Sequence, residues 1–224
     1  MCAAEVFMGY KYILFDLDGT LTDSAPGITN SAAYALKSFG IDAKPSELTA
    51  FVGPPLIDSF KRYYGMDYQQ ANRAVAAFRE YFVSRGIFEN NPYPGIADML
   101  AELKVAGKTL IVATSKPEPF AKRILAHFGL DGYFDLIAGS TLDETRTEKT
   151  DVIAYALGKA GLETADMLMV GDRCYDIDGA HALGIDAMGV LYGYGTEAEL
   201  SAAEHIAPTV ADVSHIIISL DRRG

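Results

Sequence analysis

Two aspartates two positions apart, Asp16 and Asp18, directly follow the apolar run Tyr12–Phe15 and precede Gly19 and Thr20. Side chains alternate along a strand, so both carboxylates project to the same side at a strand end. Carboxylates this close repel each other unless a cation neutralises them. Mg²⁺ suits such a site because it prefers oxygen ligands and keeps several of its waters. The run predicts a magnesium site; the alternative is a turn with solvated aspartates.

Two further apolar runs also end in polar groups that can do chemistry. Residues 110–113 precede Thr114, Ser115 and Lys116, and residues 168–170 precede Gly171, Asp172 and Asp176. In open parallel sheets, ligands bind outside the carboxyl ends of the strands, near the point where the strand order reverses. We therefore expect the three strand ends to form one site.

Residues 16–20 resemble motif I of the haloacid dehalogenase-like (HAD) phosphohydrolase superfamily, which is Asp-x-Asp-Gly-Thr after a hydrophobic strand. Thr114 resembles the motif II hydroxyl, and Asp172 and Asp176 resemble the acidic pair of motif IV, so the resemblance covers nearly the whole chain. The branch most similar to this chain is the phosphoglycolate phosphatase-like one, which also contains 5'-nucleotidases. The resemblance implies a Mg²⁺-dependent phosphatase that forms an aspartyl-phosphate.

The resemblance assigns roles to several of these residues. It implies that Asp16 is the nucleophile. It implies that Asp18 is the general acid that protonates the leaving alcohol, and later the base that activates water. Thr114 is expected to hydrogen-bond a phosphoryl oxygen. The other expected phosphate- and substrate-binding residues are Gly19, Ser115 and Lys116. Ser115 is also the expected cap of the next helix.

Lys149 is the candidate for motif III, the lysine that the resemblance places against the nucleophile and the phosphoryl group. The sequence here reads Glu148-Lys149-Thr150-Asp151, which departs from the Lys-Pro of a common branch pattern. Thr150 or Asp151 can still cap the helix that follows. Arg146 is the weaker substitute for Lys149.

The expected Mg²⁺ ligands are four aspartates: Asp16, Asp18, Asp172 and Asp176. The resemblance implies that Asp18 contributes its backbone carbonyl and that Asp172 ligates directly. Asp176 would ligate through water or orient the other ligands. These aspartates supply hard oxygen ligands, and phosphate and water would occupy the remaining coordination positions of the ion.

Short apolar runs alternate with amphipathic stretches along most of the chain, which predicts an α/β fold with a parallel sheet and crossover helices. With the resemblance, the expected architecture is a Rossmann-like three-layer core. The predicted strands are residues 12–15, 109–113, 136–138, 167–170, 187–191 and 206–207. The predicted helices between and after them are residues 96–105, 120–128, 151–160, 177–183 and 213–220.

One interval, residues 22–94, breaks this alternation. It has helical patterns at residues 28–39, 46–51, 56–64 and 69–84, and no convincing strand. A Pro- and Gly-containing turn at residues 90–95 ends it. We expect an inserted all-helical domain over 22–94, and a core domain over 1–21 and 95–224; the alternative is a set of helices that covers one sheet face. In the family that the chain resembles, this position holds the C1 cap.

Composition restricts the compartment and the partners. The chain has 224 residues, is half hydrophobic, and carries a net charge of −11. Such a charge disfavours a nucleic-acid partner, because binding a phosphate backbone needs a basic surface. The two cysteines, Cys2 and Cys174, form no disulfide framework, and no signal or membrane-spanning segment is apparent. We expect a cytoplasmic monomer or homodimer that binds a small phosphorylated metabolite and no membrane.

The sequence is compatible with several functions. The leading one is a phosphatase for a phosphoglycolate-like or nucleoside 5'-monophosphate substrate. A sugar phosphomutase would share the architecture but return the phosphoryl group to its intermediate. A dehalogenase would need neither Mg²⁺ nor an acid at Asp18. A phospho-accepting signalling module would also cluster aspartates around Mg²⁺, but such domains are shorter and lack a helical insertion.

Overall fold

The computed structural model describes residues 9–143 and 145–221 and divides the chain into two compact units. The first comprises Met1–Leu21 and Pro92–Gly224, and the second comprises Thr22–Asn91. Cys2 lies outside the described residues. Within the first unit, the backbone N–H of Tyr93 donates to the carbonyl of Leu21 at 3.2 Å, so the points where the chain leaves and returns are adjacent.

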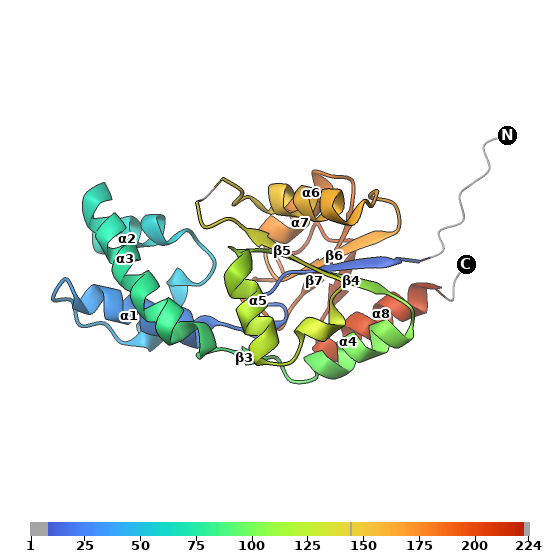
Figure 1. Cartoon of the computed structure of the whole chain (residues 1–224), viewed down its shortest axis with the longest axis horizontal. Coiled ribbons are helices and arrows are strands. Elements are labelled where there is room, and N and C mark those ends of the chain that lie inside the picture. The colour runs from blue at the N-terminus through green and yellow to red at the C-terminus, as the bar shows by residue number, and fades with distance from the viewer. Residues whose placement is uncertain (1–8, 144, 222–224) are drawn as a thin grey trace. The chain divides into compact units, whose positions relative to one another are not determined.

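The first unit is built on a parallel sheet of six strands in the order β5-β4-β1-β6-β7-β8 (Figure 1). The strands are β1 Tyr12–Phe15, β4 Thr109–Pro117, β5 Leu136–Ser140, β6 Met167–Gly171, β7 Asp186–Val190 and β8 His205–Ala207. β1 lies at the centre, between β4 and β6. Its last three residues are fully buried, as expected for a strand covered on both faces.

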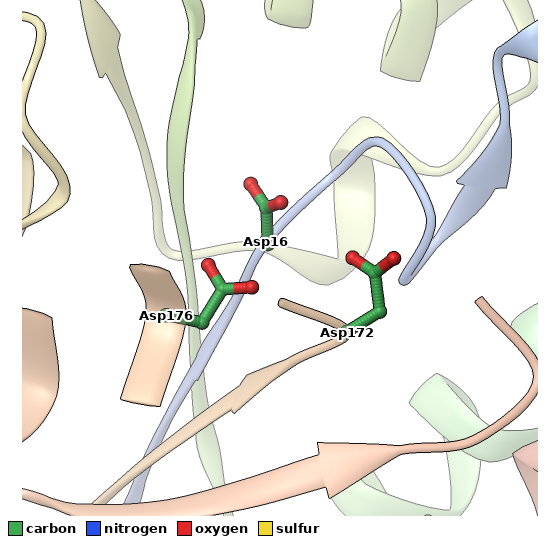
Figure 2. A group of neighbouring side chains, drawn as sticks. All are labelled: Asp16, Asp172 and Asp176. Atoms are coloured by element: carbon green, nitrogen blue, oxygen red, sulfur yellow. The ribbon is translucent and has the colours of Figure 1, made fainter. Parts of the chain in front are cut away.

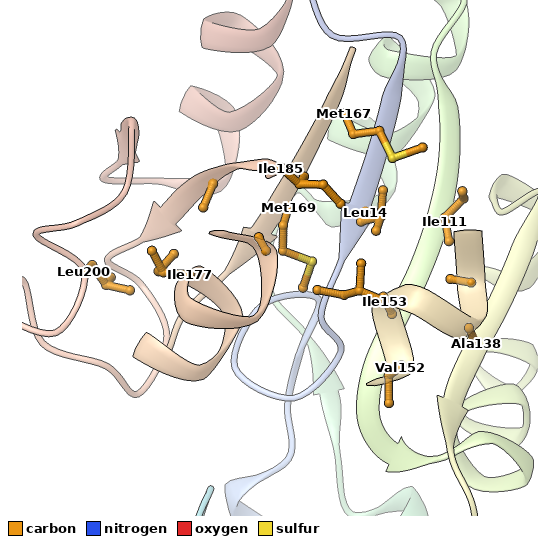
Figure 3. Close-up of a cluster of buried hydrophobic side chains, with 14 residues drawn as sticks. Leu14, Ile111, Ala138, Val152, Ile153, Met167, Met169, Ile177, Ile185 and Leu200 are labelled. Carbon is orange, nitrogen blue, oxygen red and sulfur yellow. The ribbon is translucent and has the colours of Figure 1, made fainter. Parts of the chain in front are cut away.

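Helices cover both faces of this sheet. On one face lie α6 Lys149–Ala160 and α7 Cys174–His181, and on the other lie α4 Ile96–Val105, α5 Glu118–His127 and α8 Val210–Asp221 (Figure 1). A buried cluster joins the first pair to the sheet: Leu14 and Met169 of the strands pack with Ile153 of α6 and Ile177 of α7 (Figure 3). The predicted α/β class with a Rossmann-like parallel core is confirmed.

The second unit consists mainly of three helices, α1 Ala25–Lys37, α2 Leu56–Tyr64 and α3 Tyr68–Ser84. α3 contacts both α1 and α2. Its N-terminus carries a capping box, in which the Asp67 side chain accepts from the Gln70 N–H at 2.7 Å and the Gln70 side chain accepts from the Asp67 N–H at 2.9 Å. Three short 3₁₀ turns complete the unit: η1 Pro45–Glu47, η2 Thr49–Phe51 and η3 Gly86–Phe88.

Two expectations for this interval are wrong. The predicted helix over 46–51 is two 3₁₀ turns separated by Leu48, because six residues recover little of the cost of nucleating an α-helix. The interval also contains strand: β2 Thr22–Asp23 and β3 Asn91–Pro92 form a two-stranded sheet. Two residues are too few to produce the alternation by which a strand is recognised in sequence.

Candidate active site

The parallel register brings three strand ends to one place. Phe15, the last residue of β1, pairs with Val112 of β4 and Val170 of β6. The Asp16 N–H then donates to the Val170 carbonyl at 3.0 Å, which fixes the first aspartate at the carboxyl edge of the sheet. The polar residues that follow β1 and β6, and those that end β4, therefore lie at one edge of the sheet.

A tight turn after Asp16 approaches the end of β6. Gly19 has a φ of +86°, and a Cβ atom there would overlap the carboxylate of Asp172. Only glycine permits this approach. Thr20 then donates its hydroxyl to Asp172 Oδ1 at 3.3 Å, and the N–H of Tyr194 donates to Asp172 Oδ2 at 2.7 Å. Both oxygens of Asp172 are thus held by residues distant in the sequence.

Three carboxylates form a compact buried group. Asp16, Asp172 and Asp176 each offer one oxygen, and these oxygens lie within 4.8 Å of one another. Figure 2 shows the three side chains converging from the end of β1, the end of β6 and the first turn of α7. Asp172 and Asp176 are almost fully buried, and Asp16 is 9% exposed.

Burial and mutual repulsion change the acidity of this group. Burial, and then the nearby charges of Asp176 and Asp16, raise the pKa of Asp172 to about 7. Burial also raises the pKa of Asp176 to about 6, although the Lys149 ammonium acts in the opposite direction. Both carboxyls therefore take up protons near neutral pH unless another positive charge enters the group.

Lys149 is the cation that this group already contains. Its Nζ lies 2.8 Å from Asp16 Oδ1 and 2.7 Å from Asp176 Oδ1, and donates to the Ala113 carbonyl at 3.1 Å. Burial alone would lower the pKa of this buried lysine, but the two carboxylates outweigh burial and raise the pKa above its ordinary value. Gly179 of α7 leaves room for the lysine, since a Cβ there would lie 2.8 Å from Lys149 Cγ.

The structure places Lys149, and not Arg146, beside the nucleophile candidate. The Arg146 guanidinium lies 3.5 Å from the centre of the Tyr155 ring, and its Nε donates to the Gly139 carbonyl at 3.0 Å. The expected cap at Thr150 or Asp151 is wrong, because α6 begins earlier, at Lys149, and its N-cap Glu148 makes no side-chain capping bond.

Asp18 lies beside a different lysine. Its Oδ2 is 2.6 Å from Lys116 Nζ, and the lysine is buried while the Asp18 side chain is 24% exposed. The Asp18 carboxylate does not belong to the three-oxygen group, so its predicted contribution to a metal site through the backbone carbonyl stays a prediction. The two aspartates of the motif thus have different cationic neighbours.

The end of β4 differs from expectation. The strand continues through residues 114–117, and α5 has Pro117 at its N-cap, so the expected capping role of Ser115 is wrong. Thr114 is buried, and its hydroxyl accepts from the N–H of Lys116 at 3.2 Å. Ser115 is exposed. Thr114, Ser115 and Lys116 remain predicted phosphate- and substrate-binding residues.

Sequence reasoning missed one part of the site, the loop at residues 192–195 after β7. The N–H of Tyr194 binds Asp172, and the Tyr192 hydroxyl donates to the carbonyl of Thr20 at 3.1 Å. The loop has no charged side chain, so a search for reactive groups passes over it. The available signal was the alternation of tyrosine and glycine, which indicates a backbone that approaches other groups closely.

The residues present fit a divalent cation such as Mg²⁺. Three carboxylates with one lysine ammonium leave two formal negative charges in a buried group. Burial is the main cause of the raised pKa values of Asp172 and Asp176, and the negative charge of Asp16 raises both further. Oxygen ligands without nitrogen or sulfur are the set that Mg²⁺ prefers.

The comparisons with known proteins agree with this geometry. A family model described as haloacid dehalogenase-like hydrolase matches residues 13–190, which include the three strand ends, Lys149 and the acidic pair after β6. The chain belongs to the haloacid dehalogenase-like hydrolase family. The predicted superfamily is confirmed.

Similar proteins include named enzymes of this family. A 5'-nucleotidase of Pseudomonas aeruginosa is 44% identical over 218 residues, 96% of this chain and 99% of the relative. A crystal structure of a predicted phosphatase from Clostridium acetobutylicum has a TM-score of 0.87 and 47% identity, covering 94% of this chain and 99% of that one. Phosphoglycolate phosphatase of Haemophilus influenzae is 33% identical over 83% of this chain and 87% of the relative. The predicted class, a phosphoric monoester hydrolase, is confirmed.

One relative has a different name. The tyrosine-protein kinase PtkA of Mycobacterium tuberculosis is 45% identical over 186 residues, which are 83% of this chain. This chain spans 63% of that kinase's length.

Among the described residues, no helix of the HAD-family chain is both long and apolar enough to cross a bilayer.

Proposed function

We propose that the protein is a Mg²⁺-dependent phosphatase that hydrolyses a small phosphate monoester through an aspartyl-phosphate on Asp16. The observation that carries this proposal is the convergence of Asp16, Lys149, Asp172 and Asp176 in one buried group, with Asp18 and Lys116 beside it. Such a group holds a nucleophile, a cation against that nucleophile and a carboxyl that can exchange a proton, which phosphoryl transfer requires.

In the first step, an Asp16 carboxylate oxygen attacks phosphorus and the bond to the ester oxygen breaks. Asp18 donates a proton to that oxygen, so the alcohol leaves neutral. Lys149 offsets negative charge on Asp16 and on the phosphoryl oxygens, since its Nζ is already 2.8 Å from Asp16 Oδ1. Thr114 donates its hydroxyl to a phosphoryl oxygen.

In the second step, water attacks the phosphorus of the aspartyl-phosphate and the bond to Asp16 breaks. Asp18, now ionised, accepts a proton from the water, and inorganic phosphate leaves. One group thus serves as acid and then as base. The Lys116 ammonium, 2.6 Å from Asp18 Oδ2, would hold the carboxyl in place for both proton transfers.

Asp16, Asp172 and Asp176 would hold the Mg²⁺ through side-chain oxygens, with the backbone carbonyl of Asp18 as a further ligand. The ion would neutralise charge on the phosphoryl group during transfer. Gly19, Ser115 and Lys116 would line the region around the phosphate. Gly19 has no side chain, so it would bind phosphate through its backbone, in the turn that lies against Asp172.

Two substrate classes are the leading options, phosphoglycolate-like compounds and nucleoside 5'-monophosphates. Relatives of 44% and 33% identity carry the names 5'-nucleotidase and phosphoglycolate phosphatase, which supports both classes. The family resemblance assigns residues 22–94 to a C1 cap. We propose that these residues determine which of the two substrate classes the protein hydrolyses.

A substrate screen tests the proposal. The protein, with Mg²⁺, is offered small phosphate monoesters singly, and released inorganic phosphate is measured. We expect steady turnover of at least one class, its abolition by EDTA and its return with added Mg²⁺. Steady release of phosphate at an unchanged rate after thorough chelation would contradict the metal assignment. Phosphorylated protein that accumulates without turnover would favour a phospho-accepting module.

The similarity to PtkA favours a second candidate, transfer of a phosphoryl group to a protein tyrosine. The two functions differ in the phosphoryl donor and in the acceptor. Incubation with ATP and a tyrosine peptide distinguishes them: a phosphatase leaves the peptide unmodified, whereas a kinase gives phosphotyrosine in proportion to the ADP that it forms. A sugar phosphomutase would instead require a bisphosphate and release little inorganic phosphate.

A further inference from the structure

The loop at residues 192–195, here called the β7 loop, contacts both Asp172 and the motif I turn at residues 16–20. The N–H of Tyr194 donates to Asp172 Oδ2 at 2.7 Å, and the hydroxyl of Tyr192 donates to the carbonyl of Thr20 at 3.1 Å. Thr20 in turn donates its own hydroxyl to Asp172 Oδ1 at 3.3 Å. The loop and the motif I turn therefore hold Asp172 from two sides.

The two glycines of the loop make this contact possible. A Cβ at Gly193 would overlap both the Gly19 carbonyl and the Asp172 side chain. A Cβ at Gly195 would overlap the Asp172 backbone carbonyl. A side chain at either position would push the loop away from the turn and from Asp172, because the atoms that it would meet belong to the backbone or to a buried carboxylate.

Tyr192 is itself held in place. Its ring meets the ring of Tyr93 edge-on, with centroids 5.1 Å apart and planes at 68°. Burial and the nearby groups Tyr93 and Asp172 raise the pKa of Tyr192, so the hydroxyl keeps its proton and acts as a donor. Tyr93 also donates its N–H to the Leu21 carbonyl, directly after the motif I turn.

We propose that the β7 loop is a positioning element of the metal site, and that Tyr192 is a positioning residue that orients Asp172 through the motif I turn. The inference rests on the proposed Mg²⁺ site. Groups that orient ligands are worth about 10- to 100-fold in metal affinity in other proteins. The loop can orient Asp172 before substrate binds, because Tyr194 and Tyr192 make their hydrogen bonds to protein groups, Asp172 and Thr20.

Tyr192→Phe tests the proposal, because it removes the hydroxyl and leaves the ring to pack on Tyr93. The matched control is Tyr10→Phe, which removes a tyrosine hydroxyl that donates to Asp186 Oδ2 at 2.6 Å. Asp186 lies at the start of β7, whereas the site lies at the carboxyl ends of the strands. Both variants are titrated with Mg²⁺ by calorimetry without substrate. We expect a roughly 10-fold weaker Kd for Tyr192→Phe and an unchanged Kd for Tyr10→Phe.

Kinetics provide a second measurement on the same variants. If Tyr192 positions a metal ligand, Tyr192→Phe needs more Mg²⁺ for half-maximal rate, and saturating Mg²⁺ restores kcat with little change in substrate KM. A purely structural role would not give this rescue. Gly193→Ala is expected to weaken Mg²⁺ binding further. Its control is Gly158→Ala on α6, where an added Cβ meets no atom within 4 Å.

The outcomes separate this inference from the proposed function. A folded Tyr192→Phe protein that binds Mg²⁺ as tightly as the wild type would overturn the inference. Equal weakening in Tyr10→Phe would also overturn it, since the effect would then follow from stability. A wild-type protein that takes up no Mg²⁺ overturns the inference together with the metal assignment. Mg²⁺ binding that depends on Tyr192, without hydrolysis of any monoester, upholds the inference and defeats the proposed function.

Discussion

The two aspartates of motif I differ in their surroundings, although only one residue separates them. Asp16 contacts Lys149 within the buried carboxylate group, whereas Asp18 contacts Lys116 and is partly exposed. A nucleophile must stay ionised, and a group that serves as acid and base must exchange protons with water. The different neighbours of the two aspartates are in keeping with this division of roles.

Asp16→Asn should abolish turnover, because the amide cannot form an aspartyl-phosphate. The fold should remain, since the substitution removes one of three mutually repelling charges. Phosphate release and thermal unfolding of the purified variant provide the measurement. Asp178→Asn, an exposed site on α7, is the control and should keep full activity. Turnover by Asp16→Asn above about one thousandth of the wild-type rate would argue for another nucleophile.

Lys149→Met should destabilise the protein by about 3–5 kcal/mol in EDTA, since it leaves buried carboxylates without their cation. Added Mg²⁺ should recover part of the loss. Urea unfolding with and without Mg²⁺ measures both effects. Lys122→Met, which removes an exposed ammonium paired with Glu118, is the control and should cost at most about 0.5 kcal/mol. Equal losses in the two variants would contradict the assigned role of Lys149.

The stabilising effect of Mg²⁺ should depend on pH. The pKa values of Asp172 and Asp176, about 7 and about 6, lie above their unfolded value of 3.8, so the metal-free folded protein binds more protons. The contribution of these two carboxyls to stability is then fully present below about pH 3.8 and is lost as pH rises through 6 and 7. Mg²⁺ competes with these protons, so the rise in Tm that Mg²⁺ causes should grow between about pH 5.5 and 8. A rise in Tm that is independent of pH would count against these pKa values.

At the scale of elements, sequence periodicity located the core strands and helices, and less reliably their ends. α4 and α2 have the predicted bounds because an apolar stripe and clear end signals agree. β4 extends four residues beyond its predicted end, because its polar residues resemble a loop in sequence. Of these four residues, Thr114 and Pro117 pair with β5 across a register shift, a contact that local sequence does not encode.

The candidate site was predictable for a related reason. Asp16 and Asp172 come at the ends of apolar runs, and parallel strands end at one edge, so their meeting could be inferred from the sequence. Lys149 follows no apolar run, and only the family resemblance indicated it. The contribution of the β7 loop could not be inferred from the sequence, because it comes from a backbone N–H and from glycines, which carry no reactive side chain. The separate partner of Asp18 was also hidden, since Lys116 looks like an exposed loop residue and is buried instead.

Gly179→Ala tests the contact between α6 and α7. The added Cβ would lie 2.8 Å from Lys149 Cγ, so the lysine must shift and its ammonium must move relative to Asp16. We expect kcat to fall by at least about tenfold, with helix content by circular dichroism unchanged, since alanine favours helix over glycine. Wild-type kcat in this variant would show that the position of Lys149 tolerates such a shift.

At the scale of the whole molecule, we expect Mg²⁺ binding to depend on the first unit and substrate discrimination to depend on the second. All residues of the carboxylate site belong to the unit formed by residues 1–21 and 92–224. Deletion of residues 22–91, with a short glycine linker, should leave a folded protein that still binds Mg²⁺. Discrimination among phosphate monoesters should be lost, which specificity constants for several substrates would measure. Failure of the shortened chain to fold would contradict the independence of the first unit.

The hydrogen bond between Leu21 and Tyr93 has a consequence for how a protein of this fold can evolve. Because the exit and the return of the backbone are neighbours, an inserted segment needs only closely spaced ends of its own to be accommodated. Gene rearrangements could exchange that segment while the sheet, its register and the reactive edge were inherited intact. New substrate ranges could then arise by replacement of one module, without redesign of the catalytic machinery.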